Sequence, residues 1–575
     1  MQRRLARIVS TLALLTVAAC DQSSRSNGNG SGNDGSGGSG GGDGGAGAGD
    51  QGVTPNDSGL STDFALPSTW NFGSGWQPPV QPSQPAINGN GATTTILATG
   101  ADASSSGKFG GAATGGAPSI VYPANGVVVP PNMNALEIHF IPAAGQTLFK
   151  IAFHAPTLTV IVYTGCTAVG GGCIYSADPT FWMDLVPYAR GTAPITYTIS
   201  GVNGASPGAV GTSAQQSMVF GQQDITGGIY YWNTAGAIER YDWGLPGTPP
   251  QTYLTGVQAG AICVGCHVVS RQGTRIAVGQ NIPGPAQYTV YDVATTTPLA
   301  PTGTAEGGNA NFSTFSPDGN HLLYSDGAKI GWQELLTGSI LNPSVVASGT
   351  MPDWSPDGQH MVYAKPGSAL PFAFANPGVD SASIEMLHFN GTGWDTPTTL
   401  VPFSQHNNYY PSYAPTGDWV VFNRSPSNAD SFANATIDQD AGVAPDGQLF
   451  VVSSAGGTPV ALTTADNPGN CQWPKWAPVS PDYYAGKILW LTFTSDRAYG
   501  LRLATGKQNQ LWMIGFDPAK AAAGQDPSFP AFWLPFQDIS SGNHIAQWTT
   551  TVARKPCMTV AQCDSGQACR GGYCF

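Results

Sequence analysis

The sequence predicts an all-β protein in which a small β-sandwich precedes a six-bladed β-propeller. Runs that alternate apolar and polar residues, as half-buried strands do, recur along the chain. A Ser-Pro-Asp-Gly phrase returns with an aromatic residue in front of it and an apolar strand behind it. Candidate helices are nearly absent, and Pro518 to Gln525 is the best of them. These three observations together define the fold class.

Residues 1–19 have the features of a signal peptide. Arg3, Arg4 and Arg7 precede an apolar run that is too short to cross a bilayer as a mature helix. The run ends in Val-Ala-Ala-Cys, which resembles the lipobox of bacterial lipoproteins and implies that Cys20 is lipidated. Ordinary cleavage after Ala-x-Ala is the alternative. We expect an exported chain, lipid-anchored in the bacterial cell envelope and facing the periplasm or the outer surface.

The composition fits an exported β-protein. Charged residues make up 10% of the chain and the net charge is −13, with no basic patch, which argues against a nucleic-acid partner. Residues 20–116 are rich in Gly, Ser and Pro and are predicted to form a flexible tether, although Thr93 to Leu97 could dock locally. We expect a monomer.

Residues 117–225 are predicted to form the β-sandwich. Ala135 to Phe140 alternates with period two, and Leu148 to Phe153 and Leu158 to Tyr163 repeat that character between turn residues. The segment resembles immunoglobulin-like or fibronectin-type modules at the level of the fold. Cys166 and Cys173 flank Thr-Ala-Val-Gly-Gly-Gly, so a disulfide at a hairpin tip is expected there.

Residues 226–553 carry the repeated phrase. It reads Phe-Ser-Pro-Asp-Gly at Phe315 and Trp-Ser-Pro-Asp-Gly at Trp354, and weaker copies follow near Tyr413 and Trp476. The copies are spaced by roughly 40 to 60 residues, which is typical of propeller blades. Proline and glycine form the tight turn, so Asp318 and Asp357 are predicted to be turn residues rather than catalytic acids.

These motifs resemble the TolB-type β-propeller repeat. In a six-bladed ring, Gly228 to Trp232 would supply outer strands, and Ala546 to Thr549 would supply the inner strand that closes the ring. Propellers of this type are often binding scaffolds, and some carry a fused hydrolase. This chain has no Gly-x-Ser-x-Gly elbow, so a hydrolase is not expected.

Cys263, Cys266 and His267 spell C-x-x-C-H, the attachment signal for c-type haem. The two thiols would form thioethers with haem c, and His267 would be the proximal ligand of the haem iron. A structural Cys-x-x-Cys followed by a chance histidine is the alternative. The resemblance is to the attachment motif alone, because the motif passes straight into a strand.

The repeat alignment supplies three candidates for the distal iron ligand. Methionine and histidine are the usual second ligands. We rank His544 first, because it precedes Trp548 by the same interval that separates Gly265 from Val269; Met351 and His406 follow. A haem enzyme such as a peroxidase would need an open iron position and a distal base, which the sequence does not show.

Residues 554–575 form a cysteine-rich tail. Cys557, Cys563, Cys569 and Cys574 are predicted to form two disulfides, with three pairings possible. Cys471 is left over and is predicted to be a buried thiol.

The sequence supports two functional hypotheses. The first is an envelope lipoprotein with covalent haem that acts in electron transfer or redox sensing, with a redox partner. The second is a haem-free scaffold that binds envelope proteins or glycans.

Overall fold

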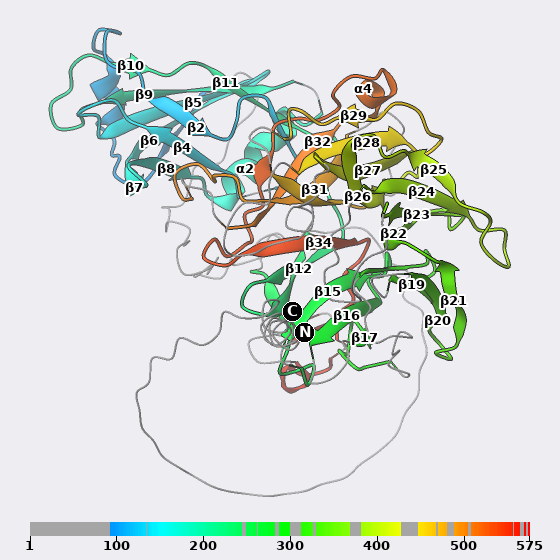
Figure 1. Cartoon of the computed structure of the whole chain (residues 1–575). Helices are drawn as coiled ribbons and strands as arrows, with labels where there is room; N and C mark the ends of the chain where they lie inside the picture. The colour runs from blue at the N-terminus through cyan, green and yellow to red at the C-terminus, as the bar shows by residue number, and fades with distance from the viewer. Residues whose placement is uncertain are drawn as a thin grey trace, which may run out of the picture. The chain divides into compact units, whose positions relative to one another are not determined.

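The computed structural model describes residues 93–575 except 134, 192, 244–248, 262, 282–286, 300–311, 326–328, 368–380, 427–446, 467–469, 480–487, 504–507, 556, 564–568, 571–572 and 575. Within this part, 36 strands and only a few short helical turns confirm the all-β fold class (Figure 1). None of the described helices is long and apolar enough to cross a membrane. The predicted signal peptide and Cys20 lie outside the described residues.

The N-terminal sheets form the predicted sandwich. The larger sheet has the strand order β1-β6-β5-β9-β11-β3, with β10 paired to β9. Its strands are β1 (Thr93–Leu97), β3 (Val127–Val129), β5 (Leu148–Ala155), β6 (Leu158–Gly165), β9 (Ile195–Val202), β10 (Gly211–Thr212) and β11 (Gln216–Phe220). The smaller sheet has the order β2-β4-β8-β7 and comprises β2 (Ser119–Tyr122), β4 (Glu137–Ile141), β7 (Thr167–Val169) and β8 (Gly172–Ser176).

Aromatic side chains join the two sheets. Phe140 of β4 and Phe149 of β5 meet edge to face with ring centroids 4.8 Å apart, and both are fully buried. Helix α2 (Pro179–Leu185) and the 3-10 turn η3 (Val186–Tyr188) add Trp182 to this core. Asp178 caps α2 by accepting a hydrogen bond from the backbone of Thr180, and Pro179 occupies the first turn. This helix was not predicted from the sequence.

The folded part begins earlier than the boundary predicted at residue 117. Strand β1 pairs in parallel with β6 along Thr93–Leu97, and the 3-10 turn η2 (Ser105–Phe109) follows it. Phe109 contacts Tyr163 of β6 at a ring distance of 5.5 Å. Residues 93–116 are therefore part of the sandwich and not of a tether, because Ile96 and Ala98 are buried in its core.

Six sheets form the propeller. Blade 1 consists of β15 (Cys263–Val269), β16 (Arg275–Asn281) and β17 (Gln287–Asp292). Blade 2 consists of β18 (Phe312–Phe315), β19 (His321–Ser325), β20 (Ile330–Glu334) and β21 (Ile340–Val346). Blade 3 consists of β22 (Thr350–Trp354), β23 (His360–Lys365), β24 (Ser383–His388) and β25 (Thr398–Val401). Blade 4 consists of β26 (His406–Tyr413), β27 (Trp419–Pro426), β28 (Gln448–Ser453) and β29 (Val460–Ala461). Blade 5 consists of β30 (Cys471–Trp476), β31 (Leu489–Ser495), β32 (Gln510–Phe516) and β33 (Phe532–Trp533), with helix α4 (Pro518–Ala522) after β32.

Blade 6 is made from both ends of the propeller segment. Strands β12 (Gly228–Asn233), β13 (Ala237–Asp242) and β14 (Gln251–Thr255) pair in order, and β34 (Asn543–Thr549) adds to β12 as the inner strand (Figure 1). The inner strands contact one another in the cyclic order β34, β15, β18, β22, β26, β30 and back to β34. The predicted six-bladed ring and its closure are confirmed.

The repeated phrase forms the predicted turn. In blade 2, Ser316 Oγ accepts the backbone N–H of His321 at 2.9 Å, and Asp318 accepts that of Asn320 at 3.0 Å. In blade 3, Ser355 accepts from His360 and Asp357 from Gln359, each at 2.9 Å. Both glycines of the phrase have a positive φ, as such turns require. The two aspartates are therefore structural.

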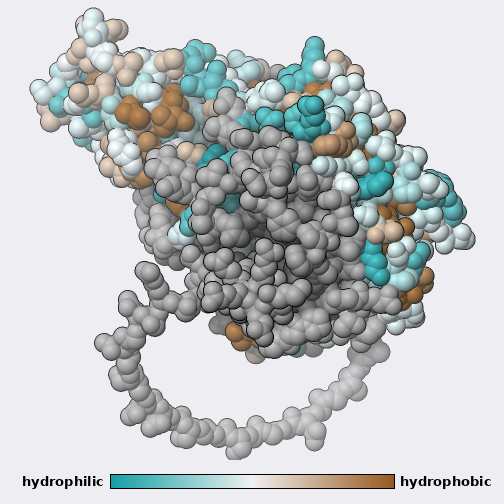
Figure 2. All heavy atoms as spheres, in the orientation of Figure 1, coloured by the Kyte–Doolittle hydropathy of each residue, from teal (hydrophilic) through white to brown (hydrophobic). Residues whose placement is uncertain are grey.

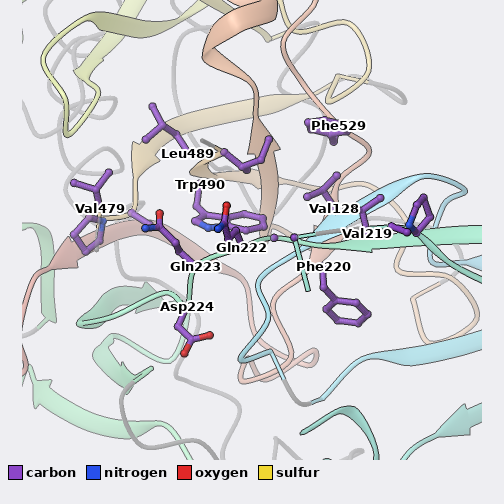
Figure 3. Close-up of a pocket in the computed structure, with 17 residues that line it drawn as sticks. Val128, Val219, Phe220, Gln222, Gln223, Asp224, Val479, Leu489, Trp490 and Phe529 are labelled. Carbon is purple, nitrogen blue, oxygen red and sulfur yellow. The ribbon is translucent and has the colours of Figure 1, made fainter. Parts of the chain in front are cut away.

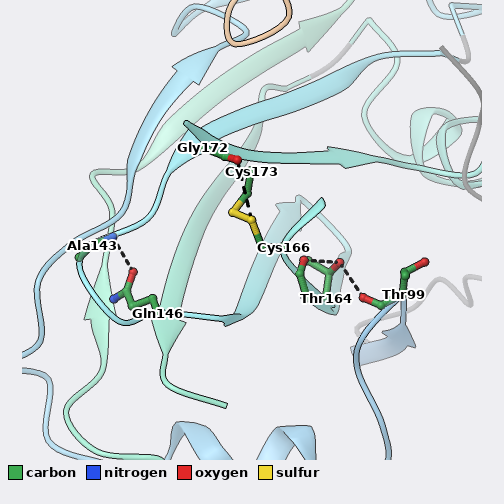
Figure 4. The surroundings of a disulfide bond; sticks show 8 residues. Thr99, Ala143, Gln146, Thr164, Cys166, Gly172 and Cys173 are labelled. Carbon is green, nitrogen blue, oxygen red and sulfur yellow. Dashed lines mark hydrogen bonds between the residues drawn. A yellow bond between two sulfur atoms is a disulfide. The ribbon is translucent and has the colours of Figure 1, made fainter. Parts of the chain in front are cut away.

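All three predicted disulfides are present. Cys166 and Cys173 close the β7–β8 hairpin, with a Cα separation of 5.1 Å (Figure 4). The tail, which includes η4 (Val560–Gln562), β35 (Cys569–Arg570) and β36 (Tyr573–Cys574), is held by Cys557–Cys569 and Cys563–Cys574. This pairing resolves the three possibilities that the sequence left open.

Candidate functional site

The C-x-x-C-H motif lies in the inner strand of blade 1, and not before it as predicted. Strand β15 begins at Cys263, and its ladder with β16 shifts between Gly265 and Val268. Cys266 sits at this shift with φ of 44°, a left-handed conformation that is unusual for a residue other than glycine.

The same irregularity recurs at one position of the repeat. Met351, Tyr410, Trp473 and Ile545 also have φ between 50° and 59°, each four residues before the position of the phrase serine. The strand pairing shifts its register at each of these residues. The shifts occur where β34 pairs with β12, β22 with β23, β26 with β27 and β30 with β31. A β-bulge in the inner strand is thus shared by five blades and is not specific to the motif, whereas the inner strand of blade 2, β18, pairs with β19 without a shift.

The residues at this position form a set that we call the axial ring: Cys266, Phe312, Met351, Tyr410, Trp473 and Ile545. Phe312 of blade 2 contacts Tyr410 of blade 4 at a ring distance of 5.8 Å, and Tyr410 contacts Trp473 of blade 5 at 5.1 Å. Met351 Sδ lies 3.4 Å from the backbone nitrogen of Tyr410. Side chains from non-adjacent blades therefore meet and fill the centre of the propeller with apolar groups.

Cys266 and His267 have different surroundings. Cys266 carries a free thiol, burial raises its pKa to about 11, and it interacts electrostatically with Tyr410 of blade 4. His267 is 2% exposed, and its Nε2 lies 3.1 Å from the carbonyl oxygen of Tyr230 in blade 6. Burial and, to a smaller extent, nearby His544 lower the pKa of His267 to about 4, although the hydrogen bond with Tyr230 opposes this shift. His267 is therefore neutral, with Nε2–H donating to Tyr230.

The described residues do not fit a covalent haem in this conformation. The prosthetic group needs two thiols and one imidazole nitrogen directed at the same macrocycle. Cys266 occupies the bulge position of the repeat, whereas His267 directs Nε2 at the backbone of the neighbouring blade, where this nitrogen cannot bind a haem iron. Its Nδ1 is buried and has no hydrogen-bond partner within the described part of the chain. The side chain of Cys263 lies outside the described residues.

The distal candidates separate into two groups. His544 is 3% exposed and lies between Trp232 and Trp473, at ring distances of 4.6 and 5.7 Å. Met351 occupies the same repeat position as Cys266. His406 is exposed at the start of β26, with Nδ1 3.1 Å from the carbonyl oxygen of Ser404. The structure thus brings His544 and Met351 to the axial ring, but not His406.

A buried ionic network joins the sandwich to blade 5, and sequence reasoning missed it. Glu137 of β4 is 3% exposed and accepts two hydrogen bonds from Arg502, at 2.7 and 2.8 Å, and one from Tyr499 at 2.9 Å. His139 Nδ1 accepts the backbone N–H of Leu501 at 3.2 Å, so its Nε2–H donates to Glu137 at 3.0 Å. Burial alone would raise the pKa of Glu137, but Arg502 and His139 hold it well below its usual range.

This network, which we call the junction lock, depends on a close backbone approach. Gly500 has φ of 47°, and a Cβ added there would lie 2.1 Å from Nδ1 of His139. The tip of the disulfide-closed hairpin lies equally close, because a Cβ on Gly170 would be 2.2 Å from the carbonyl oxygen of Leu501. No single residue in the sequence marks this contact.

A recess of about 280 Å³ lies beside this junction, between strands β3 and β11 of the sandwich and β31 of blade 5 (Figure 3). We call it the junction recess. Its apolar wall contains Val128, Val219, Leu489, Trp490 and Phe529. Its polar rim consists of Gln222, Gln223 and Asp224. Sequence reasoning missed this site, although the run Val127–Val129, apolar on both faces, is a signal that could have marked it.

A buried group of titratable side chains lies in blade 5. Cys471, which is fully buried as predicted, lies 2.8 Å from a guanidinium nitrogen of Arg497. Asp466 accepts the backbone N–H of Leu449 with both carboxylate oxygens, each at 3.0 Å. Burial raises the pKa of Asp466 to about 7, although the hydrogen bonds from Leu449 and Cys471 and the charge of Arg497 oppose the shift.

The raised pKa of Asp466 makes stability depend on pH. The folded chain holds the proton more tightly than the unfolded chain, so this contribution is present below the unfolded pKa of 3.8 and is lost as pH rises through about 7. We expect the free energy of unfolding to fall by at most about 1.4 kcal/mol per pH unit in this window. Urea denaturation at several pH values should show this slope, and Asp466→Asn should flatten it. An unchanged slope in the variant would contradict the assignment to Asp466.

The sheet order and the cyclic contacts of the inner strands define the class of protein: a closed six-bladed β-propeller joined to a β-sandwich. TolB from Acinetobacter baumannii is similar to this chain at 12% identity and a TM-score of 0.36, covering 68% of this chain and 82% of that one. A putative TolB from Agrobacterium tumefaciens has 15% identity and a TM-score of 0.31, over 56% and 99% of the two chains. A chain of a nidogen/laminin complex has 12% identity and a TM-score of 0.33, over 54% and 93%. No protein-family model matches the chain, and no curated protein does either.

Proposed function

We propose that this chain is an exported lipoprotein that binds partner proteins at the bacterial cell envelope through a rigid sandwich–propeller scaffold. Cys20 would carry the lipid, and the Gly/Ser-rich segment after it would hold the scaffold away from the membrane. The observation that carries the proposal is the junction recess, an apolar site whose two walls come from different domains. Ligand sites occur preferentially at such domain interfaces.

Two further features support a binding role. The junction lock fixes the sandwich against blade 5 through a buried bidentate ion pair, so both walls of the recess keep their relative positions. Other exposed apolar side chains of the described residues, such as Val257 and Leu336, come from separate strands and turns, and the coloured residues in Figure 2 show their apolar groups as separate brown patches.

Site-specific photo-crosslinking tests the proposal in the native envelope. A full-length chain with Gln222→p-benzoylphenylalanine is expected to give one discrete protein adduct on irradiation, because Gln222 is exposed on the rim of the recess. Val257→p-benzoylphenylalanine is the matched control, since Val257 is 90% exposed and does not line the recess. The same pattern of adducts from both positions, or none from either, would contradict a scaffold that binds through this site.

Covalent haem, with a role in electron transfer or redox sensing, is the second candidate function. The observation in its favour is that Cys266 keeps a free thiol, whereas six other described cysteines form disulfides. Against it stands the orientation of His267 toward Tyr230. A haem bound through Cys263 and Cys266 would supply a one-electron redox centre.

The visible spectrum of the protein, exported from a host with c-type haem maturation, separates the two candidates. A Soret band that remains with the denatured chain and vanishes in Cys263→Ala/Cys266→Ala, but not in Cys471→Ala, would establish the haem. We expect a colourless folded protein, because His267 directs Nε2 at the carbonyl oxygen of Tyr230, where this nitrogen cannot bind a haem iron.

A further inference from the structure

The junction recess is apolar because neighbouring strands present side chains on both faces. In β11, Met218 and Phe220 are buried in the sandwich core, so Val219 between them points out of the sandwich. In β3, Val128 likewise points outward and is covered by blade 5, where a Cβ on Gly515 would be 3.2 Å from it. Val219 remains only half-buried. The two domains therefore leave part of an apolar strand face uncovered, which a ligand could bury.

The described lining of the recess disfavours charged ligands. Among the described residues that line it, Asp224 alone carries a charge, and its carboxylate is paired with Arg190 at 2.9 Å. In Figure 3 Asp224 points away from Trp490, whereas Gln222 and Gln223 lie beside it. The chain as a whole carries a net charge of −13, which would repel an anion, and burying an unpaired charge against this apolar wall would be costly. An uncharged ligand is favoured.

The size and the rim restrict the ligand further. A volume of about 280 Å³ lies at the lower end of the roughly 300–1,000 Å³ that ligand pockets usually have, so the recess has room for a small group only. One large apolar side chain with an adjoining peptide group is a group of that size. The side-chain amide of Gln222 can donate and accept, which matches the N–H and C=O of a peptide group.

We propose that the junction recess binds a leucine- or phenylalanine-like side chain, together with its flanking uncharged peptide groups, on an extended segment of a partner protein. This rests on the scaffold function proposed above and names the chemistry that the recess recognises. The wall of Val219, Leu489 and Trp490 buries the side chain, and Gln222 holds the peptide group.

Saturation-transfer NMR with two defined probes tests this chemistry on the full chain. N-acetyl-leucinamide and N-acetyl-phenylalaninamide are expected to give signals on their side-chain protons, and N-acetyl-aspartate is expected to give none. Val219→Glu, which places a carboxylate in the recess, should weaken binding of the neutral probes at least about tenfold. Val257→Glu, at a fully exposed site, should not change it.

A second variant, at an exposed residue, separates a loss of binding from a loss of folding in Val219→Glu. Gln222→Ala changes an exposed side chain and should weaken the neutral probes by about 2- to 10-fold, the effect of one hydrogen bond. Equal signals in Val219→Glu and the parent chain, or an equal signal from the anionic probe, would overturn the proposed chemistry. If neither neutral probe gives a signal but photo-crosslinking at Gln222 still yields its adduct, the proposed ligand class is wrong and the proposed scaffold function stands. If the probe signals and the crosslinked adduct are both absent, both proposals are wrong.

Discussion

Glu137→Ala is expected to lower the free energy of unfolding by about 3–5 kcal/mol, because it leaves a buried arginine without its carboxylate. Arg502 is only 12% exposed at its side chain and makes both hydrogen bonds of its ion pair to Glu137. Tyr499 and His139 would lose an acceptor at the same time. Urea denaturation followed by circular dichroism should show the loss as a lower midpoint.

An exposed ion pair of the same chain provides the matched control. Asp224 pairs with Arg190 at 2.9 Å, but the two side chains are 46% and 38% exposed, so Asp224→Asn should cost less than about 1 kcal/mol. If Glu137→Ala cost no more than Asp224→Asn, the junction lock would not hold the two domains together. The double variant Glu137→Ala/Arg502→Met should recover part of the loss, because it removes the unpaired charge as well.

Tyr410→Ala is expected to cost about 3–5 kcal/mol, the typical effect of truncating a large buried aromatic residue. Tyr410 is 7% exposed and contacts Phe312, Met351 and Trp473 of three other blades. Its removal leaves a cavity in the axial ring that no single blade can close. Tyr573→Ala, at a half-exposed tail residue, is the control and should stay within about 0.5 kcal/mol of the parent chain.

A second substitution at the same position tests the left-handed backbone. Tyr410 has φ of 50°, where glycine is free of the penalty that a Cβ brings. Tyr410→Gly should therefore be more stable than Tyr410→Ala by about 1 kcal/mol, the reverse of the order in a regular strand. The usual order, with alanine the more stable, would show that the bulge is absent in solution.

Much of the architecture could be predicted because its signals are local. The Ser-Pro-Asp-Gly phrase encodes a turn through residues with special backbone preferences, and the tryptophan at Trp548 identified the strand that closes the ring. The close spacing of these cysteines likewise predicted the disulfides correctly.

The site was harder to predict because its signals are not local. Cys, Met, Tyr, Trp and Ile have no shared preference for a left-handed φ, so the axial ring is imposed by the blade and is invisible in composition. Glu137 and Arg502 are 365 residues apart, and no pattern in the sequence links them. The C-x-x-C-H spacing indicated haem, whereas the strand places Cys266 and His267 in different surroundings.

The seam between β12 and β34 has a consequence for biogenesis. Thr549 and Gly228 are 321 residues apart in the sequence and are joined by a hydrogen bond, so the ring cannot close until the last strand has been synthesised. Until then, blade 6 presents the edge of β12 with unpaired backbone groups, and such an edge invites pairing with other chains. The strands of the sandwich precede those of the propeller in the sequence, so the sandwich can fold before the propeller is complete. During synthesis there is therefore a period in which the incomplete propeller is prone to aggregation, and a truncation that removes Asn543 to Thr549 would keep the chain in that state.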